Sequence, residues 1–202
     1  MPKQINENYI MNKFAPVMMG MICLTISGIG LAQSAPKPET SASPLPVMGK
    51  ALRGHWTLKV AFEPASGLPA GTEGQGEETW REVVGGKTLL SEESWKAGPI
   101  DLSLLGIFWW DGKENRLHAM DCNNQGKSIC DPKDAVDAVV VKWNGKELTI
   151  EEPERGTDGK LITSRVTFKD IQANSFTELN SLEMSPGKFE PVMTIHAVRA
   201  GT

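Results

Sequence analysis

Three acidic doublets are the residues of this sequence whose types could support acid–base chemistry: Glu77-Glu78, Glu92-Glu93 and Glu151-Glu152. Such chemistry needs two carboxyl groups that converge on one reacting group. Neighbouring residues on a β-strand point to opposite faces, so no doublet supplies a convergent pair by itself. The face shared by Glu78, Trp80 and Glu82 could carry one carboxylate into the interior beside Trp80. We expect instead that these carboxylates lie on a solvated outer face.

Motifs for nucleophilic catalysis are missing from the sequence after residue 34. It contains neither the Gly-x-Ser-x-Gly of a nucleophile elbow nor the His-Glu-x-x-His of zinc proteases. Ser185-Pro186-Gly187-Lys188 matches the Ser-x-x-Lys of penicillin-recognising enzymes, but Pro-Gly predicts a hairpin turn where that motif needs the start of a helix. The sequence therefore predicts a protein that is not an enzyme.

Histidine and cysteine are sparse. We expect His55, His118 and His196 to be satisfied or exposed. His118 precedes Cys122 by four residues, but zinc ligands usually occur in tighter pairs, so no metal site is expected. Cys122 and Cys130 flank a polar loop and are candidate disulfide partners, with two free thiols as the alternative. A bridge across so short a loop stabilises by roughly 2 to 3 kcal/mol.

The elements that position these residues begin after a predicted signal peptide, residues 1–34. Two lysines precede an apolar run over 14–31, and small residues follow where a signal peptidase could cleave. Several glycines weaken the alternative, a membrane-spanning helix. Residues 35–47 are rich in Pro, Ser and Ala and are typical of a disordered tether, which leaves 48–202 as one domain. We expect a periplasmic or secreted protein, with no stable membrane insertion after cleavage.

The charge of the chain limits its partners. The formal net charge is −4, and removal of residues 1–34 takes away two lysines and one glutamate, which moves it to about −5. A nucleic-acid-binding protein needs a basic face that releases counterions from phosphate, and no cluster of Lys and Arg provides one. We therefore expect no nucleic-acid partner.

Short alternating runs of apolar and polar residues, punctuated by Gly, Pro and Asn, predict an all-β domain. The expected strands are 54–62, 77–84, 87–95, 103–110, 116–122, 135–143, 147–152, 161–169, 175–184 and 190–200. Asn144-Gly145 predicts a two-residue type I′ hairpin turn. Only 49–54 and the region after Asp131 leave space for a short helix. Because hairpin connections dominate, we expect an antiparallel up-and-down β-barrel of about ten strands.

Gly54-His55-Trp56 opens the first predicted strand and resembles the Gly-x-Trp signature at the base of lipocalins and related calycin barrels. In those barrels the indole plugs the closed end and a basic residue from a late strand packs over it. The resemblance therefore implies that Gly54, Trp56 and Arg199 form a structural plug.

Further motifs extend this resemblance over the whole domain: Glu77-Glu78-Thr79-Trp80, Gly85-Gly86-Lys87 and Trp110-Asp111. Their order is similar to that of the exported bacterial lipocalin-like family named domain of unknown function 1579. This chain departs from the Gly-Tyr-Asp of that family, since Trp110-Asp111 follows the bulkier Ile107-Phe108-Trp109. The resemblance brings no activity with it.

A more distant resemblance concerns haem. His196 on the last predicted strand loosely resembles the haem-ligating histidine of nitrobindin-type barrels. If Arg199 faces the plug tryptophan, then His196, three residues away, faces the outside of a straight strand. We therefore expect no haem and no other cofactor.

The adjacent Trp109 and Trp110 must point to opposite faces of their strand. Leu105 and Ile107 share the face of Trp109, whereas Phe108 shares that of Trp110. Both faces are apolar, so one fills the barrel and the other needs a cover. An N-terminal segment or loop, a dimer interface and a ligand cavity are the open alternatives.

The candidate ligand-binding residues are aromatic: Trp80, Trp95, Phe108, Trp109 and Trp110. The chain has no tyrosine after residue 34, so recognition would rest on shape and tryptophan stacking. We expect an exported protein that binds a small apolar ligand. The first alternative is a filled barrel that acts as a structural or interaction module of the cell envelope, as monomer or homodimer. A haem-binding barrel, or a hydrolase or isomerase with a buried group of shifted pKa, is the other.

Overall fold

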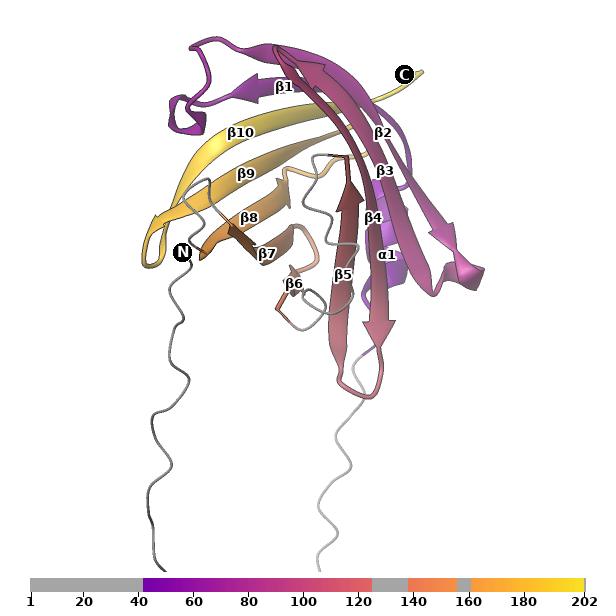
Figure 1. Cartoon of the computed structure of the whole chain (residues 1–202). Helices are drawn as coiled ribbons and strands as arrows, with labels where there is room; N and C mark the ends of the chain where they lie inside the picture. The colour runs from indigo at the N-terminus through magenta and orange to yellow at the C-terminus, as the bar shows by residue number, and fades with distance from the viewer. Residues whose placement is uncertain (1–41, 125–137, 156–160, 202) are drawn as a thin grey trace, which may run out of the picture. The chain divides into compact units, whose positions relative to one another are not determined.

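Ten antiparallel strands form a single sheet that curves into a nearly closed barrel in the computed structural model (Figure 1). The structure describes residues 42–124, 138–155 and 161–201. The strands are β1 (Gly54–Phe62), β2 (Glu73–Val83), β3 (Thr88–Ala97), β4 (Ile100–Asp111), β5 (Arg116–Asn123), β6 (Val140–Trp143), β7 (Leu148–Arg155), β8 (Leu161–Lys169), β9 (Ser175–Ser185) and β10 (Lys188–Arg199). One helix, α1 (Leu45–Leu52), and two short 3₁₀ turns, η1 (Pro64–Ser66) and η2 (Val84–Gly86), complete the described elements.

The strand order confirms the predicted up-and-down barrel. Strands that follow one another in sequence are paired, except for β5 and β6, and β1 also pairs with β10. The edges of the sheet are therefore β5 and β6. Figure 1 shows β2 to β5 on the right of the view and β8 to β10 on the left, with β1 alongside β10 at the top. Arg116 on β5 donates a hydrogen bond from Nη2 to the carbonyl oxygen of Val139, next to β6, at 2.8 Å. This contact links the two edges.

The alternation of side chains along each strand decides what fills the barrel. On β1, Trp56, Leu58 and Val60 are buried, whereas Thr57 and Lys59 between them are exposed. The same alternation places an aromatic cluster inside, composed of Trp56, Trp80, Phe108, Phe168 and Phe176. Trp80 stacks on Phe108 with ring centroids 5.3 Å apart, and its edge meets Phe168 at 5.6 Å. Phe176 continues the cluster to Trp56 at 4.8 Å.

Helix α1 contributes to the same core. Leu45, Met48 and Leu52 are buried on one side of the helix at the spacing of successive turns. The indole Nε1 of Trp56 donates a hydrogen bond to the carbonyl oxygen of Leu52 at 2.7 Å. The helix overlaps the predicted helical segment 49–54 only over 49–52, and it starts three residues before the predicted start of the domain at 48. The end of the predicted tether is therefore part of the packed domain.

The expected type I′ turn at Asn144-Gly145 is wrong. Trp143 pairs with Leu148, so the loop has four residues, and only Gly145 of the pair has a positive φ, at 95°. The Asn144 side chain explains the difference, because its Oδ1 accepts the backbone N–H groups of Lys146 and Glu147 at 2.9 and 2.8 Å. An Asx turn of this kind replaces the left-handed conformation that the two-residue turn requires.

Gly54, Trp56 and Arg199 lie together at the end of the barrel nearest α1. Trp56 is paired with Arg199 in the β1–β10 register, and the guanidinium carbon lies 4.1 Å from the indole centroid. Arg199 also donates to the carbonyl oxygens of Arg53 and Ala173, at 2.8 and 2.7 Å. Gly54 has a φ of 131°, and a Cβ there would collide with the guanidinium. The position therefore requires glycine.

Candidate ligand site in the barrel interior

Two of the acidic doublets each send one carboxylate into the barrel. Glu78 on β2 is paired with Glu93 on β3, and their side chains are only 2% and 8% exposed. The other member of each doublet, Glu77 and Glu92, is exposed on the outer face. The expectation that these carboxylates lie on a solvated face is therefore wrong for Glu78 and Glu93. One glutamate from each of the two doublets, Glu78 and Glu93, therefore forms a convergent pair. Neither doublet supplies such a pair alone.

A third glutamate joins the pair from the opposite wall. Glu178 on β9 is 5% exposed, and its Oε1 accepts a hydrogen bond from Asn180 Nδ2 at 2.7 Å. Glu93 Oε1 accepts one from the Trp95 indole Nε1, also at 2.7 Å. We call Glu78, Glu93 and Glu178 the acidic cluster. No lysine or arginine is among the buried residues in the part of the chain that the structure describes.

Burial without a cationic partner sets the protonation of the acidic cluster. Burial raises the pKa of Glu178 from its ordinary value of 4.5 to about 7, although the Asn180 hydrogen bond acts to lower it. The pKa values of Glu78 and Glu93 are raised well above 4.5, first by burial and then by the negative charge of Glu178. A carboxyl group of this cluster that loses its proton therefore places a negative charge in an apolar region. Burial disfavours that charge at all three glutamates.

Two buried polar atoms of the site lack a hydrogen-bond partner among the described residues. They are Oε2 of Glu78 and Nε1 of Trp80, two residues apart on the inner face of β2. One is an acceptor and the other a donor, and the Trp80 indole acts to lower the pKa of the Glu78 carboxyl, so the two atoms attract each other. That contact falls short of full hydrogen-bond geometry, so both atoms can still take a polar group from water or from a ligand.

The aromatic cluster forms the base beneath these carboxylates. Glu78 lies opposite Trp56 in the β1–β2 register and precedes Trp80 by one inward-facing position. Trp95, the inward residue after Glu93, is 5% exposed and its ring meets the edge of Phe62 at 5.9 Å. The interior therefore consists of an apolar aromatic part near α1 and an acidic part with Trp95 beside it.

The five predicted ligand residues do not gather in one place. Trp80 and Phe108 belong to the aromatic cluster, and Trp95 binds Glu93. Trp109 lies on the outer side of β4, where the His118 ring stacks on it at 5.2 Å and an interplanar angle of 9°. Trp110 shares the inward side with Phe108 and is half-buried. Glu78, Glu93 and Glu178 were missed as site residues. The shared face of Glu78 with Trp80 was the available signal.

The histidines also differ from one another. His55 and His196 are exposed on the outer face, where they contact the hydroxyl groups of Thr79 and Thr177 at 2.8 and 3.4 Å. His118 is buried, and its Nδ1 has no hydrogen-bond partner among the described residues. The expectation of a satisfied or exposed ring therefore holds only in part for His118, whose Nε2 lies 3.4 Å from Glu114 Oε2.

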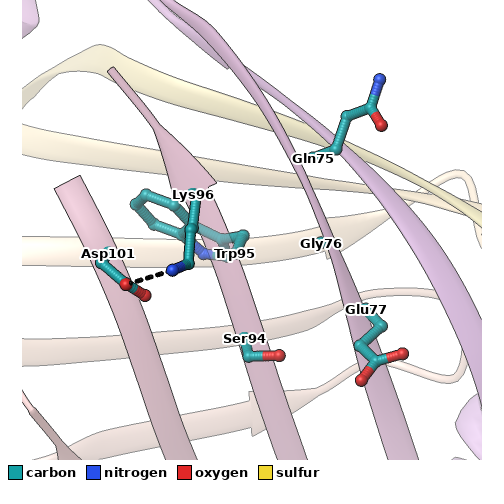
Figure 2. Close-up of a pocket in the computed structure, with 7 residues that line it drawn as sticks. All are labelled: Gln75, Gly76, Glu77, Ser94, Trp95, Lys96 and Asp101. Carbon is teal, nitrogen blue, oxygen red and sulfur yellow. Dashed lines mark ion pairs between the residues drawn. The ribbon is translucent and has the colours of Figure 1, made fainter. Parts of the chain in front are cut away.

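Two surface depressions lie outside the acidic cluster. The first, about 440 Å³, spans the outer side of β2 to β4, and Figure 2 shows it with Lys96 extended toward Asp101, an ion pair of 2.7 Å. Its lining includes the exposed Glu77 and Gln75. The second, about 370 Å³, lies between the β4–β5 hairpin and β6 and is lined by residues that include Trp110 and Trp143. Both open to solvent, and neither includes a member of the acidic cluster.

Cys122 is disulfide-bonded, whereas Cys130, its predicted partner, lies outside the described residues. The predicted signal peptide, residues 1–34, also lies outside them. Among the described residues, no helix has both the length and the apolar character needed to cross a bilayer.

The interior can accept positive charge or protons. Glu178, with a pKa near 7, can gain and lose a proton close to neutral pH, as a general acid or base must. A bound cation would replace those protons and relieve the repulsion between Glu78, Glu93 and Glu178. The aromatic rings beside the carboxylates add the faces on which organic cations stack.

Comparison with known proteins leaves the family open. No protein-family model matches the chain, and no curated protein matches its sequence. A solved structure titled "Structure of EF1p2_mFAP2b bound to DFHBI" is similar over 75% of this chain and 98% of that chain, with 11% sequence identity and a TM-score of 0.39. Functional conclusions therefore rest on the residues of this chain.

Proposed function

We propose that this chain is an exported binding protein that takes up a small organic cation, with a protonated amine and an apolar body, in the acidic part of its barrel. The observation that carries the proposal is the acidic cluster: Glu78, Glu93 and Glu178 are buried together, and no lysine or arginine is buried in the described ranges. A ligand ammonium would offset their charge and could donate to Glu78 Oε2, whose contact with the Trp80 indole falls short of full hydrogen-bond geometry.

The aromatic residues support the second half of the proposal. Trp80 and Phe176 are buried two residues from Glu78 and Glu178 on the inward sides of β2 and β9, and their rings lie next to these carboxylates. Cations that lie over such rings gain roughly 0.5 to 2 kcal/mol, and an apolar ligand body gains from burial. The sequence alone favoured a purely apolar ligand, because it did not place the carboxylates inside. The buried charge makes a cationic group the better match.

Export rests on separate support. The apolar run at 14–31 has the features of a signal peptide, and Cys122 is disulfide-bonded, as in proteins of oxidising compartments. The resemblance to exported lipocalin-like barrels agrees with both. Expression of the full precursor in a bacterium tests this part: a periplasmic product whose mass lacks residues 1–34 is expected, and an uncleaved cytoplasmic product would contradict it.

Three indole compounds of similar shape test the ligand class. Tryptamine carries an ammonium, tryptophol a neutral hydroxyl and indole-3-propionate a carboxylate. Isothermal titration at pH 8 should show the tightest binding for tryptamine, weaker binding for tryptophol and none for the carboxylate. A shorter amine, butylamine, checks whether size limits entry. Equal affinities for the three indoles, or binding of the carboxylate alone, would contradict the proposal. Native mass spectrometry of the same sample reports any retained ligand and the oligomeric state.

A further inference from the structure

The hairpin between β4 and β5 brings together three side chains that commonly bind metal ions. Asp111, Glu114 and His118 each offer a ligand atom, and these atoms all lie within 4.8 Å of one another. The group is separate from the acidic cluster, because Glu114 is exposed at the hairpin and His118 faces the outer side of β5 with Trp109. Nothing in the proposed binding of an organic cation uses these residues.

The hairpin backbone fixes Asp111. Its Oδ1 accepts the backbone N–H groups of Lys113 and Glu114, at 2.7 and 3.1 Å. Asn115 then adopts a positive φ of 56°, which turns the chain into β5. Asp111 is thus positioned by local backbone structure before any ion binds.

The His118 ring is fixed from the other side. It pairs with Trp109 across the hairpin and lies flat on the indole, with its side chain only 6% exposed. Its Nε2 is 3.4 Å from Glu114 Oε2, and its Nδ1 has no hydrogen-bond partner among the described residues. A buried imidazole thus has one long polar contact, which exceeds the usual hydrogen-bond length of about 2.7 to 3.2 Å.

That separation suits two ligands of one ion. Ligand bonds of about 2.0 to 2.1 Å in a tetrahedral site place neighbouring ligand atoms about 3.4 Å apart. Glu114 is exposed, so its side chain can adjust to complete the site without disturbing the core. The buried ring would gain a strong partner, and its charge-neutral form is the one that binds metal.

From this geometry we propose that Asp111, Glu114 and His118 bind a divalent first-row transition ion, with Zn²⁺ as the best match. One imidazole nitrogen and two carboxylate oxygens form a donor set of mixed hardness, which suits Zn²⁺ better than Mg²⁺ or Ca²⁺. Three protein ligands leave a fourth position for water or another small ligand. Asp111 and Glu114 supply two negative charges that offset the charge of the ion.

Calorimetric titration of the full mature chain with Zn²⁺, after dialysis against a chelator, tests the site. We expect one ion per chain, and affinity lowered by about tenfold or more in both D111N and E114Q. D111N keeps an oxygen that can accept the Lys113 and Glu114 N–H groups, and Glu114 is exposed, so both variants should fold. The matched control is E92Q, which alters an exposed glutamate on β3.

A second readout locates the ion. Co²⁺ bound at His118 should quench the fluorescence of Trp109, so the quenching amplitude should fall in W109F but persist in W143F. The exposed His55 and His196 are the rival ligands, and H55A/H196A should bind as the parent chain does. Loss of Zn²⁺ binding in H55A/H196A, unchanged affinity in both D111N and E114Q, or no binding by the parent chain would overturn the proposal.

Discussion

Glu78 and Glu93 face each other across β2 and β3, and both carboxyl groups are buried inside the barrel. Their doublet partners Glu77 and Glu92 lie one residue away on the outer face. A substitution of Glu78 or Glu93 can therefore be compared with the same substitution at the neighbouring outer glutamate of the same strand. Two buried carboxyl groups destabilise the fold, whereas glutamine would fill the same volume without an ionisable group. Cation binding gives a reason for the presence of glutamate at these two positions.

Replacing an inner glutamate by glutamine should stabilise the ligand-free protein. E78Q and E93Q remove a buried carboxyl group whose ionisation is disfavoured by burial, so each should raise the free energy of unfolding by about 1 to 3 kcal/mol at pH 8. E77Q and E92Q should leave it nearly unchanged, since exposed pairs such as Arg81–Glu92 contribute little. Urea unfolding of the four variants measures this. A loss of stability in both E78Q and E93Q would mean that their charges are compensated in the fold.

The stability of the protein should fall as the pH rises through the neutral range. The pKa of Glu178 is about 7 in the folded chain and near 4.5 when unfolded, so the folded state binds more protons between these values. This contribution is fully present below pH 4.5 and is lost as the pH passes 7, a change of roughly 3 kcal/mol. E178Q keeps an oxygen for Asn180 and should flatten the profile of Tm against pH. A profile that E178Q leaves unchanged would contradict the assignment.

Gly54 should tolerate no side chain. G54A places a methyl group where the Arg199 guanidinium lies and imposes a φ of 131° on alanine, so it should cost about 2 to 4 kcal/mol. Gly67 also has a positive φ, at 75°, but open space around it, so G67A should cost only about 1 kcal/mol. Thermal unfolding compares the two. Equal losses would show that backbone strain alone, without the contact to Arg199, explains the glycine.

Helix α1 should be part of the folding unit. Leu45 is 3% exposed and Val47 is 55% exposed, two residues apart in the helix. L45A should therefore cost about 2 to 4 kcal/mol, and V47A should cost little beyond its small difference in helix propensity. Denaturant unfolding of both variants tests whether the domain begins before residue 48. If L45A behaved like V47A, the helix would not contribute to the core.

The strands could be predicted from the sequence because apolar and polar side chains alternate along them. The expected bounds of 54–62 and 161–169 coincide with β1 and β8. Trp56, Leu58 and Val60 alternate with polar residues on β1, and Val166 and Phe168 do so on β8. Helix α1 was predicted only in part from the sequence. Its buried positions Leu45 and Met48 straddle the expected boundary at 48, and the prolines before them favoured a tether.

The acidic cluster could not be predicted in full from local patterns. Alternation shows that Glu78 shares a face with Trp80, but the inward face is chosen by packing against other strands. The pairing of Glu78 with Glu93 depends on the register that η2 sets between β2 and β3. Glu178 enters from β9, far along the chain, and only barrel closure brings it near the pair. The side chains of Asp111, Glu114 and His118 likewise meet only through the hairpin.

The most direct test of the central claim compares two double variants in tryptamine binding at pH 8. E78Q/E93Q replaces two inner glutamates, and E77Q/E92Q makes the same two replacements at the neighbouring outer positions. Calorimetry should show affinity weakened by about tenfold or more in the inner variant, a loss of 1.4 kcal/mol or more, and unchanged in the outer variant. Equal affinity in the two variants would contradict binding of the cation at the acidic cluster.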